Sequence, residues 1–324
     1  MMRYERADLI VVGGGLVGCL AARAAVARGL TVRLVDEGRP RLLEPITYHC
    51  ALETGELVSW LDPSLTTWQS FDSARYPLDQ QTFERLEVGP ELADLRQALE
   101  LGGQAHQVMD SEETNRTFRY LRLPEQWTAV RMARAGRLSS PQLLTHLWEN
   151  LAGVHSDCQI RFLDLEHESP TAVSYEVAFR GRYLLVAAGD ATGGLLGLEL
   201  PGRVNRKAVY YGGGEPSFGG VRLEQTWEFE PGDQGFELLG PDAEPPKQLR
   251  RLAPGLFDYR LGERQISEVQ RPYLGGLDFR SDIFGYTSLG SRHRVLAPRL
   301  AEVAIETLLG ERTLPASLAY GRSE

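Results

Sequence analysis

The stretch that most constrains this chain runs from Ala7 to Gly38, ADLIVVGGGLVGCLAARAAVARGLTVRLVDEG. Leu9–Val12 is a short apolar run, which predicts a buried parallel strand. The alanine-rich segment that follows predicts a helix, and Gly29 would end it as a C-cap. Val32–Val35 predicts a second buried strand. Strand, glycine-rich loop, helix and strand in this order indicate the βαβ unit of a dinucleotide-binding fold.

The loop of this unit has the pattern G-x-G-x-x-G. In such loops the glycines make the turn, let backbone approach a pyrophosphate and let helix pack on strand. The pyrophosphate lies at the helix N-terminus, where free N–H groups and the helix dipole favour negative charge. We expect ligand contacts from Gly13, Gly15, Leu16, Val17 and Gly18. Asp36 occupies the place of the acid that binds the ribose, with Glu37 as a secondary contact.

Length and charge limit the classes of protein that this chain can represent. Its 324 residues suffice for two lobes with a large core, and the net charge of −9 argues against a nucleic-acid partner. The three cysteines have no metal-ligand spacing, so we expect no metal site. We find no secretory leader and no apolar run long enough to span a bilayer, which predicts a cytoplasmic protein away from membranes.

The rest of the chain alternates between regular and irregular patterns. We expect an irregular loop after Gly38, crossing the ligand crevice, and an irregular excursion over residues 110–124. Residues 175–188 indicate a hairpin turning at Arg180-Gly181-Arg182, and residues 203–240 an antiparallel sheet. Ser139 and Ser140 predict a helix start with a serine cap. A strand, a glycine turn and a helix from about Ala297 follow near the C-terminus.

Three segments carry a resemblance to a known family. They are the N-terminal unit, VAAGDATGGLL at residues 186–196, and the C-terminal runs RQISEVQRPYLGG and GYTSLGSRHRVLAPRLAEVAIETLLGERTLP. Together they resemble the D-amino-acid-oxidase family, which includes glycine oxidase, sarcosine oxidase and the FAD half of the bifunctional wobble-uridine tRNA-modifying protein. The resemblance implies FAD as cofactor and an α/β fold. A Rossmann-like, glutathione-reductase-type FAD-binding domain would adjoin a substrate domain built on an antiparallel sheet.

The resemblance also implies domain boundaries and flavin contacts. The FAD-binding domain would comprise residues 1–75, 131–200 and 276–324, and the substrate or cap domain residues 76–130 and 201–275. Ala188 and Gly189 would follow the flavin. The start of the C-terminal helix would face the flavin pyrimidine carbonyl and stabilise charge there, through Gly290, Ser291, Arg292 and Val295.

Arg264 is the candidate for binding a substrate carboxylate. It lies seven residues before Arg271, which begins the sequence RPYLG. In glycine-oxidase-like members an arginine at this place holds the carboxylate of the substrate. A planar guanidinium does so with two parallel hydrogen bonds, which would fix the α-carbon over the flavin. Arg271 as the clamp, or Arg264 as a surface residue, are the alternatives.

Three further side chains are candidates. His49 lies in Thr47–Ala51, which is similar to the segment that holds flavin covalently in dimethylglycine-dehydrogenase-type relatives; the alternative is a loop histidine near a non-covalent cofactor. His293 stands where the family commonly has glycine, and would bind flavin or substrate, transfer a proton, or only begin a helix. Tyr211, like Tyr210, would orient a substrate or simply pack in the sheet.

The resemblance implies an FAD-dependent oxidase or dehydrogenase that oxidises the C–N bond of a small amine or amino acid. Hydride would pass from the carbon beside nitrogen to flavin N5. A flavin-binding accessory or maturation protein is the first alternative, because the cap region is short and the loop after Gly38 is bulky. An NAD(P)-dependent enzyme is the second, and the C-terminal segments disfavour it. A protein partner and a homo-oligomer both stay open.

Overall fold

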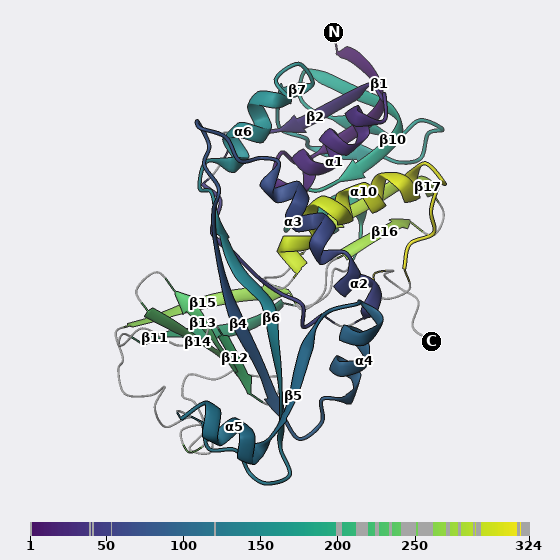
Figure 1. The fold of residues 1–324 in the computed structure, drawn as a ribbon. Coiled ribbons are helices and arrows are strands. Elements are labelled where there is room, and N and C mark those ends of the chain that lie inside the picture. Colours follow the sequence, from purple (N-terminus) through teal and green to yellow (C-terminus); the bar gives the residue numbers. More distant parts are fainter. Residues whose placement is uncertain are drawn as a thin grey trace.

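The computed structural model describes residues 2–38, 40, 42–52, 54–119, 121–198, 203–211, 220–223, 227–232, 235–240, 251, 262–269, 273–277, 280–287, 289, 293–315 and 318. Between residues 203 and 273 it describes strand backbone, together with the side chains of Arg222 and Arg251. Figure 1 shows one sheet and its helices at the top, and a second sheet with long strands below.

The first sheet is mostly parallel. Its strands run in the order β16-β17-β10-β1-β2-β7, with β9 beside β10 and β8 beside β9. They are β1 (Arg3–Val12), β2 (Val32–Asp36), β7 (His155–Asp157), β8 (Phe162–Asp164), β9 (Thr171–Val173), β10 (Val177–Val186), β16 (Tyr273–Leu277) and β17 (Arg280–Thr287). β7, β2, β1, β10 and β17 are parallel to one another. Leu9–Val12 is buried because both faces of β1 are covered, which explains its unbroken apolar run.

Helices from distant parts of the sequence cover this sheet. They are α1 (Leu16–Ala27), α6 (Leu143–Asn150), α7 (Ala191–Leu196), the 3-10 turn η2 (Arg294–Leu296) and α10 (Ala297–Leu308). Helix α1 packs directly on α10, which Figure 1 shows as purple beside yellow. Ala21, Ala22 and Ala25 of α1 are fully buried, and such small side chains let two helices approach closely. The two ends of the chain therefore build the same half of the molecule.

The second sheet forms the lower part of the molecule. Its order is β15-β11-β14-β13-β12-β4-β6-β3, with β5 beside β6. The strands are β3 (Ile46–His49), β4 (Asp79–Gly89), β5 (His106–Asp110), β6 (Thr128–Ser139), β11 (Arg203–Tyr211), β12 (Gly220–Leu223), β13 (Trp227–Gly232), β14 (Gly235–Gly240) and β15 (Gly262–Val269). Described neighbours are antiparallel except β12 and β4, which are parallel. The predicted antiparallel second sheet is confirmed, and β3 and β6 belong to it. The division into domains stays a prediction.

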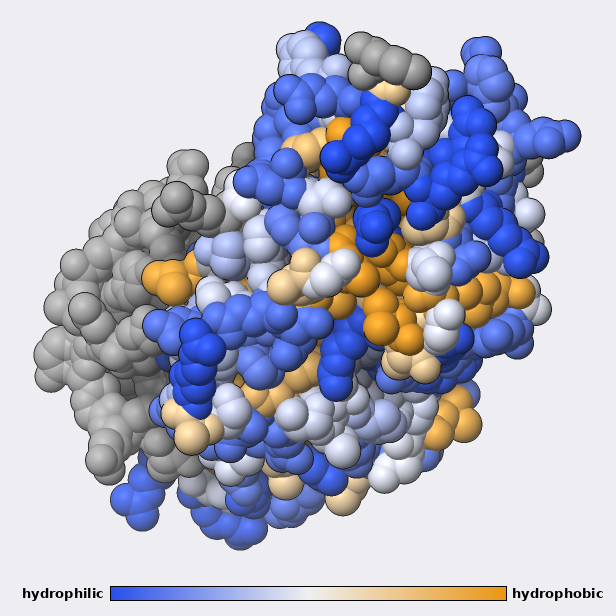
Figure 2. All heavy atoms as spheres, turned by 90° about the horizontal axis from the view of Figure 1, so that it is seen from above, coloured by the Kyte–Doolittle hydropathy of each residue, from blue (hydrophilic) through white to orange (hydrophobic). Residues whose placement is uncertain are grey.

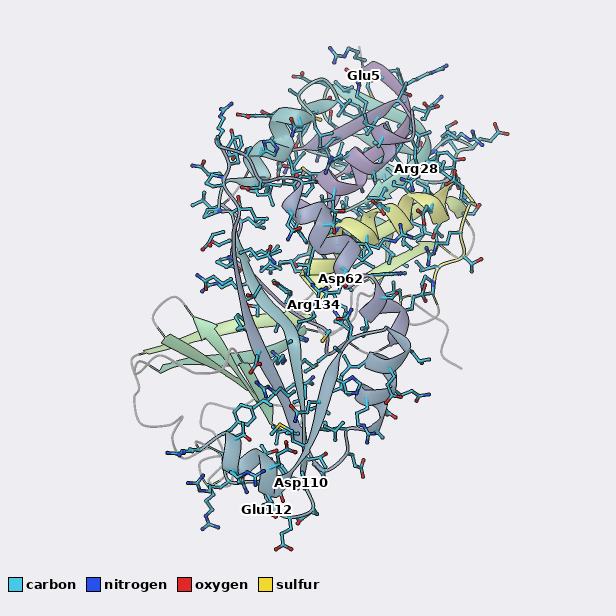
Figure 3. The ribbon with its side chains drawn as sticks, in the orientation of Figure 1. Glu5, Arg28, Asp62, Asp110, Glu112 and Arg134 are labelled. Carbon is cyan, nitrogen blue, oxygen red and sulfur yellow. The ribbon has the colours of Figure 1, made fainter. Side chains whose placement is uncertain are left out.

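Four short helices accompany the second sheet: α2 (Gly55–Ser59), α3 (Leu61–Gln69), α4 (Ala93–Leu101) and α5 (Ser111–Thr117). Helix α3 also packs against α10, so it touches both halves of the molecule. Figure 3 shows Asp62 of α3 and Arg134 of β6 pointing toward one another. Their ion pair, at 3.1 Å, links the helix to the second sheet. Asp110 and Glu112 lie at the far tip of the sheet, by α5.

The hairpin predicted over residues 175–188 is wrong. The structure has one continuous strand, β10, that crosses Gly181 without turning. It pairs with β1 along its length, through Tyr4 opposite Ala178 and Val12 opposite Val186. A Cβ atom at position 181 would lie 2.9 Å from Cγ1 of Ile10. The glycine therefore serves a close approach between β10 and β1, not a turn.

Two segments predicted as irregular contain regular structure. The segment after Gly38 forms β3, α2 and α3, and residues 110–124 contain α5. Asp110 begins α5 by accepting a hydrogen bond from the Glu113 N–H at 2.8 Å, as an N-cap aspartate does. The predicted serine cap is also wrong, because Ser139 ends β6 and Gln142 precedes α6 with no side-chain cap bond.

The surface seen from above is mostly hydrophilic, with apolar atoms gathered near the centre of the face (Figure 2). The described large apolar side chains with high exposure include Tyr4, Phe162 and Tyr175. Arg180 lies over the Tyr4 ring and Arg161 over the Tyr175 ring, at 5.7 and 4.1 Å from the ring centroids.

No helix in the described part of the chain is long and apolar enough to cross a membrane.

Candidate functional site

Gly13 of the loop between β1 and α1, and Gly18 in the first turns of α1, have no room for a side chain. Gly13 has φ +106°, a backbone conformation that favours glycine, and a Cβ there would overlap with the Ala187 carbonyl. A Cβ on Gly18 would overlap with the carbonyl oxygen of Gly13. Gly15 differs, because a Cβ there would meet no atom within 4 Å. Open space therefore lies beside Gly15, at the N-terminus of α1.

The backbone N–H and carbonyl of Gly14 are held by hydrogen bonds to three side chains. The Gly14 N–H donates to Asp36 Oδ2 at 2.5 Å. The Gly14 carbonyl accepts from the Trp148 indole N–H at 2.6 Å and from the Cys19 thiol at 3.2 Å. Burial raises the pKa of the Cys19 thiol to about 12, and the nearby Asp36 carboxylate adds to the shift, so this thiol stays protonated and donates. The loop is therefore fixed by side chains from α1, β2 and α6.

Two adjoining cavities lie along this loop. The first, of about 550 Å³, extends from the glycine loop to the ends of β2 and β10. Its lining includes Gly13, Gly14, Gly15, Asp36, Glu37, Trp148, Cys158, Ala188 and Gly189. The second, of about 360 Å³, is lined by residues that include Leu16, Val17, Leu42, Glu44, Tyr286, Thr287 and Arg294. Gly15, Ala187 and Gly189 line both, so the two cavities meet at the N-terminus of α1.

The segment after β10 is held close to this meeting point. Gly189 has φ +58°, and its carbonyl accepts a hydrogen bond from the Thr287 hydroxyl at 3.0 Å. The Ala187 N–H donates to the Val12 carbonyl at 2.7 Å, which continues the pairing of β10 with β1. The backbone from Ala187 to Gly189 therefore forms a wall of both cavities. This placement is consistent with the expected approach of Ala188 and Gly189 to a cofactor.

The start of α10 is fixed by two buried side chains. The Trp68 indole N–H donates to the Val295 carbonyl at 2.6 Å, and the Tyr286 hydroxyl donates to the Ala297 carbonyl at 3.0 Å. Complete burial raises the pKa of the Tyr286 hydroxyl well above its ordinary value, so this group stays a donor. Arg294 reaches Glu44 at 3.6 Å across the second cavity, which both residues line. The loop after β2 thus runs along this cavity, as expected.

The remaining candidates lie apart from the described cavity linings or outside the description. His49 is buried in β3, opposite Ala135, and its Nδ1 accepts the Ala51 N–H at 3.2 Å. His293 is buried just before η2, and Val295 is buried within it. Gly290, Ser291, Arg292 and Arg271 lie outside the described residues. Arg264 stands opposite Ala208, and Tyr210 opposite Gly262, in adjacent strands; Tyr211 stands opposite Phe236.

Two residues that shape the site are not predicted from the sequence. Trp148 lines the first cavity and binds the glycine loop. The Trp68 indole binds the start of α10. Both partners lie more than a hundred residues away in the sequence, so no local pattern marks these contacts. In the described part of the chain no three metal-ligating side chains gather.

The cavities and loop fit an FAD molecule. The first turn of α1 leaves N–H groups without intrahelical acceptors at the junction of the cavities, where a diphosphate would be stabilised. Gly13 and Gly18 are tightly enclosed, while Gly15 leaves space for close approach of a ligand to backbone. Asp36 and Glu37 place carboxylates at the outer end of the first cavity. These features suit an elongated dinucleotide.

Comparison with protein families gives the same result. A model of the DAO family, described as FAD-dependent oxidoreductases, matches residues 8–215. The match spans more than half of the 324 residues, and the chain belongs to this family. It is an FAD-dependent oxidoreductase, and FAD is its cofactor. The predicted family, fold class and cofactor are thereby confirmed. None of the curated proteins matches the chain.

Several solved structures share the fold across nearly the whole chain. L-amino acid deaminase from Proteus vulgaris, with its specific insertion sequence deleted, has a TM-score of 0.71 and 16% identity, covering 98% of this chain and 94% of that one. Glycine oxidase from Geobacillus kaustophilus has a TM-score of 0.70 and 15% identity, covering 98% and 99%. L-proline dehydrogenase from P. horikoshii has a TM-score of 0.70 and 14% identity, covering 95% of each chain. At these identities the likeness establishes the fold.

Proposed function

We propose that this protein oxidises the C–N bond of a small amine or amino acid. The observation that carries the proposal is the pair of cavities that meet at Gly15. Together they extend from Asp36 and Glu37, which would bind the ribose, to Arg294 near the start of α10. The similar structures named above are an amino acid deaminase, a glycine oxidase and a proline dehydrogenase, which supports the substrate class. The antiparallel sheet would supply the substrate side of the site.

In this proposal the protein mainly binds and orients. Bound FAD would supply the redox chemistry by accepting a hydride at N5 from the carbon beside the substrate nitrogen. The α1 N-terminus would hold the diphosphate, with Asp36 and Glu37 at the ribose. The start of α10, fixed by Trp68 and Tyr286, would direct peptide dipoles toward negative charge in the second cavity. Such preorganised dipoles stabilise developing charge without moving during the reaction.

Substrate recognition would involve Arg264, which would hold a carboxylate with two parallel hydrogen bonds. Strand positions two apart share a face of the sheet, so the backbone register groups Arg264 with Ala208 and Tyr210 rather than with Tyr211. Of the two tyrosines predicted from the sequence to orient the substrate, the register therefore favours Tyr210, and Tyr211 stays the alternative. His293 stays a candidate for proton transfer next to the flavin. His49 stays a candidate for covalent attachment of flavin.

The absorbance spectrum of the purified protein, before and after acid precipitation, tests the cofactor. We expect a flavin spectrum that appears in the supernatant, which would exclude attachment to His49. Yellow colour in the pellet would instead support attachment at His49 or the neighbouring Cys50. Protein that stays colourless after addition of FAD would overturn the proposal and revive an NAD(P)-dependent enzyme.

An anaerobic screen of amines and amino acids then tests the reaction, with bleaching of the flavin as the signal. A substrate that carries a carboxylate should bleach the wild type, and Arg264→Met should raise its apparent Kd about 10-fold or more through loss of a charge-assisted pair. Tyr210→Phe and Tyr211→Phe form a matched pair, and only the residue that contacts substrate should alter the reduction rate. A flavoprotein that no amine reduces would favour the accessory role.

A further inference from the structure

The Gly14–Gly15 peptide is held in one orientation by side chains of α1 and α6. Its carbonyl oxygen accepts from the Trp148 indole N–H at 2.6 Å and from the Cys19 thiol at 3.2 Å. The preceding Gly14 N–H is held by Asp36 Oδ2 at 2.5 Å. The described part of the chain contains no cis peptide bond, so this peptide is trans. In a planar trans peptide the C=O and N–H groups point in opposite directions.

The direction of the Gly15 N–H follows from these bonds. Because the carbonyl faces Trp148 and Cys19, the Gly15 N–H faces away from both side chains. Gly15 is a residue at which the two cavities meet, and a Cβ there would touch nothing within 4 Å. The N–H is therefore free of side-chain crowding at the place where a dinucleotide passes from one cavity to the other. A hydrogen bond from this N–H to a diphosphate oxygen would be charge-assisted.

Trp148 itself is held in place. It lies on α6, and its ring contacts the His155 ring of β7, with centroids 4.2 Å apart and the ring planes tilted by 41°. A Cβ on Gly14 would lie 2.8 Å from Cζ2 of Trp148, so the indole closes directly against the glycine loop. A rigid, supported donor keeps the loop peptide oriented before the ligand arrives. Phenylalanine at this position would fill most of the space but would donate no hydrogen bond.

We infer that Trp148 is a positioning residue for the cofactor diphosphate, acting through the Gly14–Gly15 peptide. It fixes the carbonyl of Gly14 so that the Gly15 N–H is directed at the diphosphate of bound FAD. Trp148 thus contributes to cofactor affinity without donating to the cofactor. The inference deepens the proposed function through its bound cofactor, and it holds whichever amine is oxidised.

Trp148→Phe in the apoprotein tests the inference, with Trp60→Phe as the matched control. Trp60 is buried where Trp148 is half-buried, and it lies against Arg299 and Arg312 at 5.8 and 5.3 Å, apart from both cavity linings. Loss of one oriented hydrogen bond should raise the Kd of FAD and of ADP about 5- to 10-fold in Trp148→Phe. The Kd of adenosine, which has no diphosphate, should stay within about 2-fold, and Trp60→Phe should bind all three as wild type does.

Two further measurements separate positioning from a merely structural role. The 31P resonances of bound FAD should move in Trp148→Phe and stay unchanged in Trp60→Phe. If Trp148→Phe fails to fold, benzothienylalanine at position 148 keeps the ring shape and removes only the N–H donor, and should show the same changes. Wild-type affinity for FAD and ADP in a variant without the N–H, or an equal loss for adenosine, would overturn the inference. A wild-type apoprotein that binds neither FAD nor ADP would overturn the proposed function as well.

Discussion

Contacts with single atoms determine which positions of the glycine motif can carry a side chain. Gly18 contacts the carbonyl of Gly13 so closely that no side chain fits, whereas Gly15 faces open space at an ordinary φ of −69°. The two glycines of one motif therefore have separable physical roles. Gly18 serves the packing of helix on strand, and Gly15 serves the approach of the ligand. The sequence pattern predicts both roles for the motif. It does not show which neighbouring atoms require a glycine at each position.

Alanine substitutions should separate these roles. Gly18→Ala should lower the free energy of unfolding of the apoprotein by about 1–3 kcal/mol, because the added methyl overlaps with the Gly13 carbonyl. Gly15→Ala should change it by less than about 0.5 kcal/mol but raise the Kd of FAD about 10-fold or more, because the methyl would occupy the ligand's approach. Urea unfolding and FAD titration measure the two effects. Equal destabilisation by both substitutions would contradict the assignment.

The buried thiols give the chain a pH dependence on the alkaline side. Burial raises the pKa of the Cys19 and Cys50 thiols to about 12, from an ordinary value of 9.0. Above pH 9 the unfolded chain releases these protons while the folded chain keeps them, so the free energy of unfolding falls as pH rises toward 12. Below pH 9 both the folded and the unfolded chain hold these protons, so the two thiols no longer make the free energy of unfolding depend on pH.

Cys50→Ala should remove one thiol's share of this dependence. Between pH 8 and pH 10 the wild type should lose about 1.4 kcal/mol more of its free energy of unfolding than Cys50→Ala loses. At pH 10, one unit above the ordinary pKa of 9.0, thiolate outnumbers thiol about ten to one in the unfolded chain, while the folded chain keeps the proton. Urea unfolding at the two pH values measures the difference. The same loss in both proteins would show that this thiol ionises equally in the folded and unfolded chain.

At the scale of single elements, β4 carries an ion pair within the core. Arg85 Nε donates to Glu87 Oε1 at 2.8 Å, and side-chain exposure is 1% and 3%. Arg222 of the neighbouring β12 lies 3.8 Å from the other Glu87 oxygen. Residues two apart in a strand share a face, so both charges lie on the same side of β4. Burying charge is costly unless it is paired, which makes each partner depend on the other.

Removing one partner should therefore be strongly destabilising. Glu87→Ala should lower the free energy of unfolding by about 3–5 kcal/mol, because it leaves Arg85 buried without this carboxylate. Glu84→Ala in the same strand is the matched control. Glu84 pairs with Arg131 at 2.6 Å, but both side chains are more than a third exposed, so the loss should be below about 1 kcal/mol. Chemical unfolding of both variants measures the contrast, and similar losses would refute it.

How far the sequence predicts an element depends on whether its pattern is local. The unit β1, α1 and β2 is predicted in its order and types, because the strands hold continuous apolar runs and Gly29, at φ +79°, ends the helix; β1, however, begins at Arg3, before its apolar run at Leu9. β4 is not predicted, although Leu86 and Val88 alternate with Arg85 and Glu87, because its polar first half hides the pattern and its partner β6 lies far along the chain. β10 was misread as a hairpin, because Gly181 fits a turn as well as a close contact. The order of elements, and with it the family, was nevertheless predictable.

At the scale of the whole molecule, the cofactor site joins segments that the sequence separates. The lining of the first cavity comes from β1, β2, α6, β10 and α7, and the second adds β17 and the start of η2. A ligand that binds only where these segments meet binds the folded state alone. Such a ligand stabilises the folded state by a free energy that grows with the logarithm of its concentration over its Kd.

Removal of FAD should therefore lower the thermal stability of the whole chain. At a free FAD concentration of 100 times the Kd, the holoprotein should be more stable than the apoprotein by about 2.7 kcal/mol. Calorimetry of the apoprotein titrated with FAD measures the rise in Tm. FMN, which lacks the adenosine half that would reach Asp36, is the control and should raise Tm less. A Tm independent of FAD would mean that the cofactor does not bridge these segments.

The position of β10 between β1 and β17 has a consequence for synthesis on the ribosome. The glycine loop and β2 emerge first, but β10, the other neighbour of β1 in the sheet, ends only at Val186, and α10, which packs on α1, ends at Leu308. A nascent chain therefore contains the glycine motif long before the strands and helices that enclose this motif have been synthesised. Loading of the flavin is expected to wait until translation is nearly complete, so ribosome-bound chains stalled before residue 293 should capture none.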